Sequence, residues 1–408
     1  MASLLFTGGR LLDPTHDALL DSMEVLVEGE EVREVSARPI SSASATRIDL
    51  AGRTLMPGLV DAHVHVVSAV ISGGQNAMQH NSLAALRASR VMNSMLLRGF
   101  TTVRDLGGGD QGLAMAVEER LIDGPRLVVC GKALGQTGGH SDGRARSDDR
   151  PDFGGRVGSL GRLVDGVDNL RRACREEIKA GAQFIKLMAN GGVASPNDPI
   201  HAFGYSRAEI EAAVEEAENA GTYVAAHLYT DKAIRRAVEC GVHSLEHCNL
   251  IQVETASLAV ARGAIACPTL VAYEGLARDG KTLGLSAESI AKIETVRTAG
   301  LESLDIMRGA GLPMAYGSDL LGGLHHYQAM EFELRARVLP IPEILRSATL
   351  VAAKLCRMEG KVGVLAPGSF ADLLVVDGDP FRDLGVLQQT ERMAAIMRGG
   401  RFFKNTLR

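Results

Sequence analysis

The sequence predicts an α/β protein built as a (β/α)8 TIM-type barrel, with a small β-sandwich domain formed by both chain termini. Two observations lead to this fold class. Short β-branched runs alternate with longer Ala-, Leu- and Glu-rich stretches through the middle of the chain, and strand-and-turn segments occur at both ends. A doubly wound open sheet is the alternative, but no Gly-x-Gly-x-x-Gly fingerprint follows a strand and opens a helix.

The β-rich ends are the first element. Residues 1–57 contain the short alternating segments "SLLFTGGRLLD", "MEVLVEGEEVREV" and "TRIDLAGRTLMPG", each interrupted by Gly, Pro or Asp. The end of the chain is similar, with "GSFADLLVVDGDP" and "RMAAIMRGGRFF". We expect 1–57 and 358–408 to form one small β-sandwich domain, which leaves 58–357 for the barrel.

The middle of the chain supplies the strands of the predicted barrel. Eight strands with intervening helices over about 300 residues are what such a barrel requires. The predicted strands are 59–65, 101–105, 126–130, 183–188, 222–228, 242–248, 264–269 and 313–319. Two intervals, 131–164 and 189–205, are longer than a barrel needs. Both follow strands, so we expect both at the carboxyl ends of the strands, where active sites form.

Composition excludes several functional classes. The 408 residues carry a formal charge of −5, which gives no electrostatic case for binding nucleic acid or an anionic membrane. No window approaches the roughly 20 apolar residues of a membrane span, and the N-terminus lacks the basic region of a signal peptide. The six cysteines are scattered without a Cys-x-x-Cys pair, which is typical of buried, reduced thiols in a cytoplasmic protein.

The stretch "GLVDAHVHV" places His63 and His65 one residue apart. A strand sends residues i and i+2 to the same face, so both imidazoles can reach one space while Val64 points away. Facing imidazoles are a common zinc arrangement, but two such histidines are also found as ordinary core or surface residues. The pair by itself therefore leaves both interpretations open.

Other polar side chains fall at the ends of the predicted apolar strands. They are Lys186, His227, His247 and Asp319. Each one alone has an ordinary structural interpretation, such as a hydrogen-bonded histidine, a salt-bridged lysine or a helix cap. Their combination with the histidine pair at the strand ends of one barrel favours a catalytic or metal-binding site over separate structural roles. Arg104 and Asp105, at the end of the second strand, are expected to form an ion pair at the barrel rim.

These motifs resemble the amidohydrolase superfamily of metal-dependent hydrolases over essentially the whole chain. The similarity rests on "PGLVDAHVH", the strand-four lysine, "AAHLY", "SLEHCN", "YGSD" and "ATLVAAKLCRMEGKVGVLAPGSFADLLVVDGDP". The resemblance implies two divalent metal ions, with zinc as the expected element. His63, His65 and Asp319 would hold the first ion and His227 and His247 the second. A carbamate formed from CO2 on Lys186 would bridge the two ions.

The resemblance also implies a reaction. A hydroxide that bridges the two ions would attack the scissile carbonyl, because metal ions lower the pKa of bound water far below its value of about 15.7 in bulk. Asp319 would be the catalytic residue that accepts the proton and passes it to the leaving amine.

Three further stretches are similar to the prolidase-like branch, the Xaa-Pro dipeptidases and their relatives. They are "TGGHSDG", "IKLMANGGVASPNDP" and "AAHLYT". This resemblance implies that His140 and Tyr229 bind the substrate. The branch typically has Gly at the position of Ser141 and Gly or Ala at that of Cys248, so the fine substrate preference is the part in doubt.

The sequence therefore predicts a binuclear-metal hydrolase of dipeptides, Xaa-Pro above all, or of N-acyl amino acids. We expect a cytoplasmic homo-oligomer that acts on small molecules and binds neither nucleic acid nor membrane. One alternative is a cyclic-amide hydrolase resembling imidazolonepropionase, which uses a single metal and lacks the bridging lysine. The other is a non-catalytic assembly protein of the same fold that has lost its metal ligands.

Overall fold

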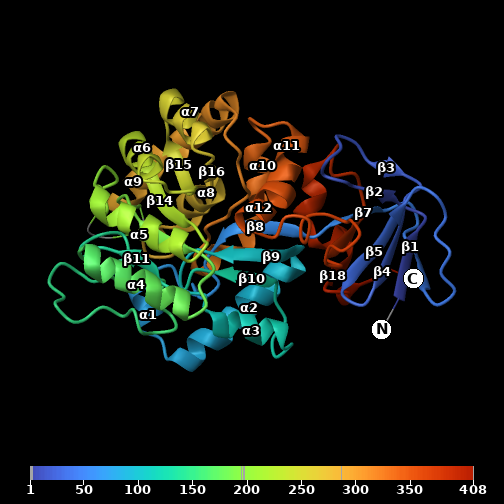
Figure 1. The fold of residues 1–408 in the computed structure, drawn as a ribbon, viewed down its shortest axis with the longest axis horizontal. Coiled ribbons are helices and arrows are strands. Elements are labelled where there is room, and N and C mark those ends of the chain that lie inside the picture. Colours follow the sequence, from blue (N-terminus) through green and yellow to red (C-terminus); the bar gives the residue numbers. More distant parts are fainter. Residues whose placement is uncertain (1–2, 194, 196–197, 286, 408) are drawn as a thin grey trace.

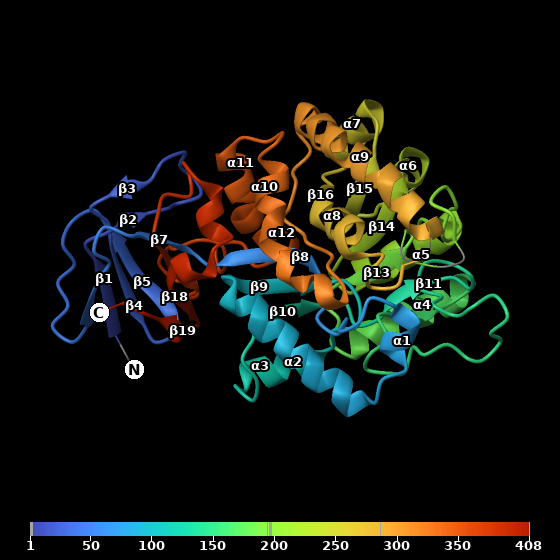
Figure 2. The same ribbon diagram turned by 180° about the vertical axis from the view of Figure 1, so that it is seen from behind.

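The computed structural model describes residues 3–193, 195, 198–285 and 287–407. Figures 1 and 2 show a β-rich part that holds both chain ends and a larger part in which helices and strands alternate. Among the described residues, no helix is both long and apolar enough to cross a membrane. All six cysteines are buried, free thiols, as the sequence predicts.

Two sheets make up the β-rich part. A four-stranded sheet has the order β5 (Glu31–Ser36), β4 (Glu24–Glu28), β1 (Ser3–Thr7), β6 (Thr46–Asp49). A six-stranded sheet has the order β19 (Arg401–Asn405), β18 (Met393–Arg398), β17 (Leu373–Val376), β7 (Thr54–Pro57), β2 (Arg10–Leu11), β3 (Leu20–Asp21). The antiparallel pairing of β17 with β7 joins the two ends of the chain. Side chains of both sheets, including Phe6, Val25, Leu373 and Met397, share one buried cluster.

The strands of the middle part are parallel. One sheet has the order β10 (Arg126–Val129), β9 (Phe100–Asp105), β8 (Leu59–Val64). The other has the order β12 (Gly161–Leu163), β11 (Ala133–Gly135), β13 (Ile185–Met188), β14 (Val224–Thr230), β15 (Ser244–Leu250), β16 (Ile265–Cys267). Seven of the eight predicted segments overlap one of these strands.

The predicted strand 313–319 is not a regular strand. It makes a single parallel bridge between Met314 and Ala266, and the amide of Ala62 donates to the carbonyl of Tyr316 at 2.8 Å. Asp319, at the end of this segment, has a φ of 49°, a left-handed conformation outside the β region. The interval 131–164, which is longer than a barrel needs, contains the short strands β11 and β12.

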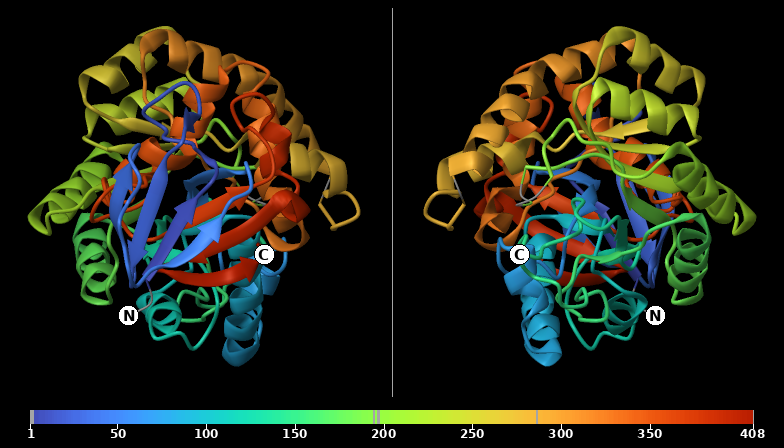
Figure 3. Two further views of the ribbon diagram at one scale, coloured as in Figure 1. Left: turned by 90° about the vertical axis from the view of Figure 1, so that its right-hand side faces the viewer. Right: turned by 90° about the vertical axis from the view of Figure 1, so that its left-hand side faces the viewer.

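Helices surround the parallel strands on the outside (Figure 3). The α-helices are α1 (Gly73–Ala77), α2 (Asn81–Leu97), α3 (Gln111–Glu118), α4 (Val167–Lys179), α5 (Arg207–Asn219), α6 (Asp231–Glu239), α7 (Val253–Ala261), α8 (Leu270–Asp279), α9 (Ala287–Ala310), α10 (Glu331–Arg335), α11 (Ile341–Arg346) and α12 (Ala352–Leu355). A π-helical turn spans Ser347–Val351, and 3₁₀ helices span Gly322–Met330, Leu384–Leu387 and Thr390–Arg392.

Alternation along the parallel strands divides the core into two clusters. Val60 and Ala62 of β8 belong to one buried cluster with Ala225 of β14 and Ile265 of β16. The neighbouring residues on these strands, such as Leu59 and Ala226, belong to a second cluster that includes the helices. Apolar packing on both faces fixes the register of the strands, and with it the positions of the polar side chains at their ends.

Candidate active site

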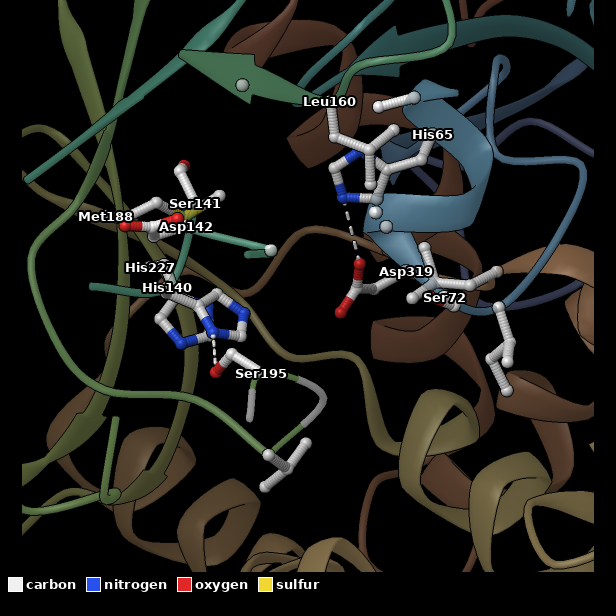
Figure 4. A pocket seen from close by; sticks show the side chains of 18 of the residues that line it. His65, Ser72, His140, Ser141, Asp142, Leu160, Met188, Ser195, His227 and Asp319 are labelled. Carbon is white, nitrogen blue, oxygen red and sulfur yellow. Dashed lines mark hydrogen bonds and ion pairs between the residues drawn. The ribbon is translucent and has the colours of Figure 1, made fainter. Parts of the chain in front are cut away.

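A cavity of about 460 Å³ opens beside the carboxyl ends of the parallel strands. Every site residue predicted from the sequence lines it: His63, His65, His140, Lys186, His227, Tyr229, His247 and Asp319. Figure 4 shows His65 beside Asp319 on one side of this space and His140 over His227 on the other. The structure therefore brings the predicted residues together from six separate segments of the chain.

The first group around the cavity is His63, His65 and Asp319. The Nε2 atoms of His63 and His65 lie 3.3 and 3.1 Å from Oδ1 of Asp319. Burial opposes ionisation of Asp319, but the nearby histidines hold the pKa of its carboxyl well below the usual range. The nitrogen and oxygen atoms of these three side chains lie within 4.8 Å of one another, close enough to ligate one metal ion.

The second group is His227 and His247. Their ring centroids are 4.6 Å apart, and the His247 ring is 5.0 Å from that of His63, so the two groups adjoin. Burial lowers the pKa of both imidazoles well below the usual value, and the positive charges around them add to this effect. Both rings are therefore held neutral, which is the form that binds metal.

Lys186 lies on β13, next to β14, the strand that carries His227. Its side chain is buried, and burial lowers the pKa of its amine. Within the described part of the chain, no hydrogen bond or ion pair engages this amine. A buried amine without a partner is costly, and a lowered pKa favours the neutral form that can react with CO2.

Hydrogen bonds on the far side of each ring fix the orientation of three histidines. The Nδ1 of His63 lies 2.8 Å from Glu246 Oε2, and that of His65 lies 3.0 Å from the carbonyl of Gly107. A carboxylate and a carbonyl only accept hydrogen bonds, so each Nδ1 donates and each Nε2 faces the cavity. His247 is held similarly, with its Nδ1 2.8 Å from Thr269 Oγ1. Such outer partners are typical of histidines that ligate metals.

The expected ion pair between Arg104 and Asp105 is wrong. As neighbours on β9 they point to opposite faces, and each supports a different histidine. Arg104 binds Glu246, the partner of His63, at 2.8 Å. Asp105 accepts hydrogen bonds from the amides of Gly107 and Gly109 at 2.9 and 2.8 Å, which shapes the turn that presents the Gly107 carbonyl to His65.

His140 and Tyr229 extend the site away from Asp319. The ring of His140 stacks on that of His227 with centroids 4.2 Å apart, and its Nδ1 lies 2.8 Å from Ser195 Oγ. The Tyr229 ring lies 4.7 Å from that of His227. Sequence reasoning missed Ser195, and it also missed Glu246, Gly107, Thr269 and the cavity-lining Tyr273. Only Glu246 gave a usable signal, as a charged residue inside the apolar strand "SLEHC".

The backbone beside Asp319 passes close to His63. A Cβ on Gly317 would lie 2.5 Å from Cys267 Sγ and 2.9 Å from the Cβ of His63. We therefore expect Gly317→Ala to lower the free energy of unfolding by about 1–3 kcal/mol, because a packed interior does not accept an added methyl group. Urea unfolding would measure this loss. Gly309→Ala is the matched control, since nothing lies within 4 Å of that position in α9; an equal loss in both variants would contradict the packing explanation.

The chain is similar in sequence and in fold to known proteins. Residues 54–402 match the profile of the amidohydrolase family. The chain belongs to this family. Among curated relatives of this amidohydrolase, ochratoxinase of Aspergillus niger is 30% identical over 372 residues, which cover 86% of this chain and 75% of that protein.

Solved structures agree with this membership. A prolidase complexed with N-methylphosphonate-L-proline is 47% identical, with a TM-score of 0.97, over 99% of this chain and 100% of that one. A Xaa-Pro dipeptidase with methionine in its active site is 27% identical, with a TM-score of 0.89, over the same shares of the two chains. The resemblance to the prolidase-like branch is thereby confirmed, and the likeness implies that this amidohydrolase has a TIM-type barrel.

Proposed function

We propose that this amidohydrolase carries two metal ions and cleaves the amide bond before the C-terminal residue of dipeptides, Xaa-Pro dipeptides first, or of N-acyl amino acids. One observation carries the proposal: the buried, unpaired Lys186 lines the same cavity as four histidines and Asp319. The similarity to a prolidase and to a Xaa-Pro dipeptidase supports the reaction and the substrate class.

The donor set fits a pair of divalent ions, which we propose to be Zn²⁺. His63, His65 and Asp319 would hold one ion and His227 and His247 the other, with a carbamate on Lys186 spanning both. An ammonium group would repel two dications, whereas a carbamate is an anion with two oxygen atoms. When bound, the ions supply charge that polarises a carbonyl group and acidifies water.

The remaining steps fall to the side chains of the chain. Asp319, held ionised by the adjacent histidines, accepts a proton during the attack and passes it to the leaving amine. His140 and Tyr229 lie across the cavity from His65 and bind the substrate. A phenol and an imidazole can hold a substrate carboxylate or donate to the oxygen on which charge develops.

Tyr229→Phe tests the substrate-binding role. We expect kcat to fall on the order of 10²-fold with the fold intact, because the variant loses only a hydroxyl donor. Steady-state kinetics on a cleaved dipeptide measures the effect. Tyr205→Phe is the matched control: that tyrosine is also buried, but its hydroxyl binds the carbonyl of Val164 outside the cavity. Equal kinetics in the two variants would exclude Tyr229 from substrate binding.

Apolar side chains on the cavity wall guide the choice of substrates to test. Leu160, Met188, Val193 and Leu276 line the space beside the polar groups. Such a wall favours substrates with an apolar acyl part, whether an amino acid residue or an acyl group. A library of Xaa-Pro and other dipeptides, screened beside N-acyl amino acids, would identify the substrate, and no cleavage of any member would refute the proposed function.

Metal content separates the proposal from its alternatives. Mass spectrometry of the purified protein should find close to two ions per chain. One ion per chain would favour the imidazolonepropionase-like cyclic-amide hydrolase. A chain that binds no metal would favour the non-catalytic assembly protein, although all six predicted ligands are present.

We further propose that the parallel strands close into one barrel over 58–357, and that 1–57 and 358–408 form a β-sandwich. Hydrogen bonds from Gln183 to Val129 and from Ala62 to Tyr316, both 2.8 Å, support the closure. The shared cluster of the two terminal sheets supports the sandwich. The homo-oligomer remains a prediction, which light scattering would test.

A further inference from the structure

A buried arginine lies beneath the candidate metal centre. Arg104, on β9, is wholly buried and makes hydrogen bonds to three other segments of the chain. Its Nε donates to the carbonyl of Ala62 at 2.7 Å, one of its terminal nitrogens donates to Tyr223 and Ser244 at 3.0 Å each, and the other donates to Glu246 Oε1 at 2.8 Å. The guanidinium group therefore braces β8, β9 and β15 and the residue that precedes β14.

Glu246 links this arginine to the site. One oxygen accepts from Arg104 and from the hydroxyl of Ser244, and the other lies 2.8 Å from Nδ1 of His63. Arg104 also donates to the carbonyl of Ala62. It therefore fixes both the backbone next to His63 and the carboxylate that accepts the hydrogen bond of the imidazole. The same arginine thus fixes the backbone position of His63 directly and, through Glu246, the orientation of its ring.

We propose that Arg104 and Glu246 are a positioning pair that sets the orientation and tautomer of His63, with a proton on Nδ1 and with Nε2 facing the cavity, where it would bind the metal ion. The proposal rests on the proposed function in one respect, namely that His63 holds a metal ion. An ionised carboxylate accepts hydrogen bonds but cannot donate them, so His63 has no other tautomer that satisfies this contact. Loss of such a partner typically weakens metal binding 10–100-fold.

A role in stability alone does not explain this arrangement. The chain contains a second buried pair, Glu331 with Arg335, also at 2.8 Å and also wholly buried. That pair lies within one helix and contacts none of the proposed ligands. Buried pairs stabilise a fold little more than apolar packing does, so the contact with His63 is what distinguishes Arg104 and Glu246.

The test is Glu246→Gln, with Glu331→Gln as the matched control. Both variants remove the charge of a buried carboxylate that faces an arginine. Zn²⁺ affinity, measured by chelator competition on the reconstituted protein, should fall 10–100-fold in Glu246→Gln and less than threefold in the control. Long-range ¹H–¹⁵N NMR of the metal-free wild-type protein should show the proton of His63 on Nδ1, assigned by the signal that is lost in His63→Gln.

A double variant keeps the test decisive if Glu246→Gln fails to fold, since that change leaves Arg104 without its partner charge. Arg104→Met combined with Glu246→Gln removes both charges and should show the same 10–100-fold loss of Zn²⁺ affinity. Wild-type affinity in this variant, or an Nδ1 of His63 that carries no proton, overturns the inference and leaves the proposed function intact. A wild-type protein that binds no Zn²⁺ would instead refute the proposed function, while the NMR signal still tests the tautomer.

Discussion

Replacing Lys186 with alanine is expected to remove both metal ions and to lower kcat/KM on the order of 10³-fold or more. The loss should exceed the 10–100-fold effect of losing a supporting group, because the proposed carbamate contacts both ions. Lys186 has the properties this role requires: it is buried, its pKa is lowered and it lines the same cavity as the histidines. Metal analysis and steady-state kinetics on the same preparation measure both effects.

A chemical rescue distinguishes this role from a structural one. In Lys186→Ala the vacated space can admit a short carboxylate such as propionate, which supplies the two oxygen atoms of the missing carbamate. We expect propionate to restore part of the activity of this variant. Lys186→Met fills the same space without an anion and should be inactive with or without propionate. If Lys186→Met retained both ions and full turnover, a bridging lysine would be excluded.

The second large effect is expected for Asp319→Asn, which should lower kcat about 10²–10⁴-fold, the usual contribution of general acid–base catalysis. The amide has the same shape as the carboxylate but cannot accept the proton. Single-turnover kinetics would show that the chemical step itself has slowed. The retained Asn oxygen can still face His63 and His65, so the variant should fold normally.

Asp372→Asn is the control for this prediction. Asp372 is also buried, but it binds the amide of Gly399 in the β-rich part of the molecule and does not line the cavity. We expect its kcat to match that of the wild type. If Asp319→Asn also remained within tenfold of the wild type, Asp319 would not be the proton acceptor.

Local sequence patterns were sufficient to predict most of the parallel strands and the residues at their ends. Apolar β-branched runs define a buried strand, and a histidine or lysine at the end of such a run is visible without knowledge of its neighbours. The segment 313–319 departs from this pattern: it makes a single bridge, Asp319 at its end has a left-handed backbone, and Gly317 lies close to His63. None of these features follows from apolar periodicity.

The supporting contacts could not be predicted because they join residues that are far apart in the chain. Glu246 meets His63 across 183 positions, and Gly107 meets His65 across 42. Arg104 and Asp105 look like an ion pair in the sequence since they are adjacent, yet alternation along β9 sends them to different histidines. The ligand types are thus a local property of this chain, whereas their orientation is a property of the assembled strands.

The aromatic side chains of the cavity give this protein a built-in optical signal. The chain contains no tryptophan and only six tyrosines, and two of these, Tyr229 and Tyr273, line the cavity with ring centroids 5.9 Å apart. Intrinsic fluorescence therefore comes from tyrosine alone. A single tryptophan introduced at Tyr273 would report on ligand entry at a wavelength that no other residue of the chain contributes.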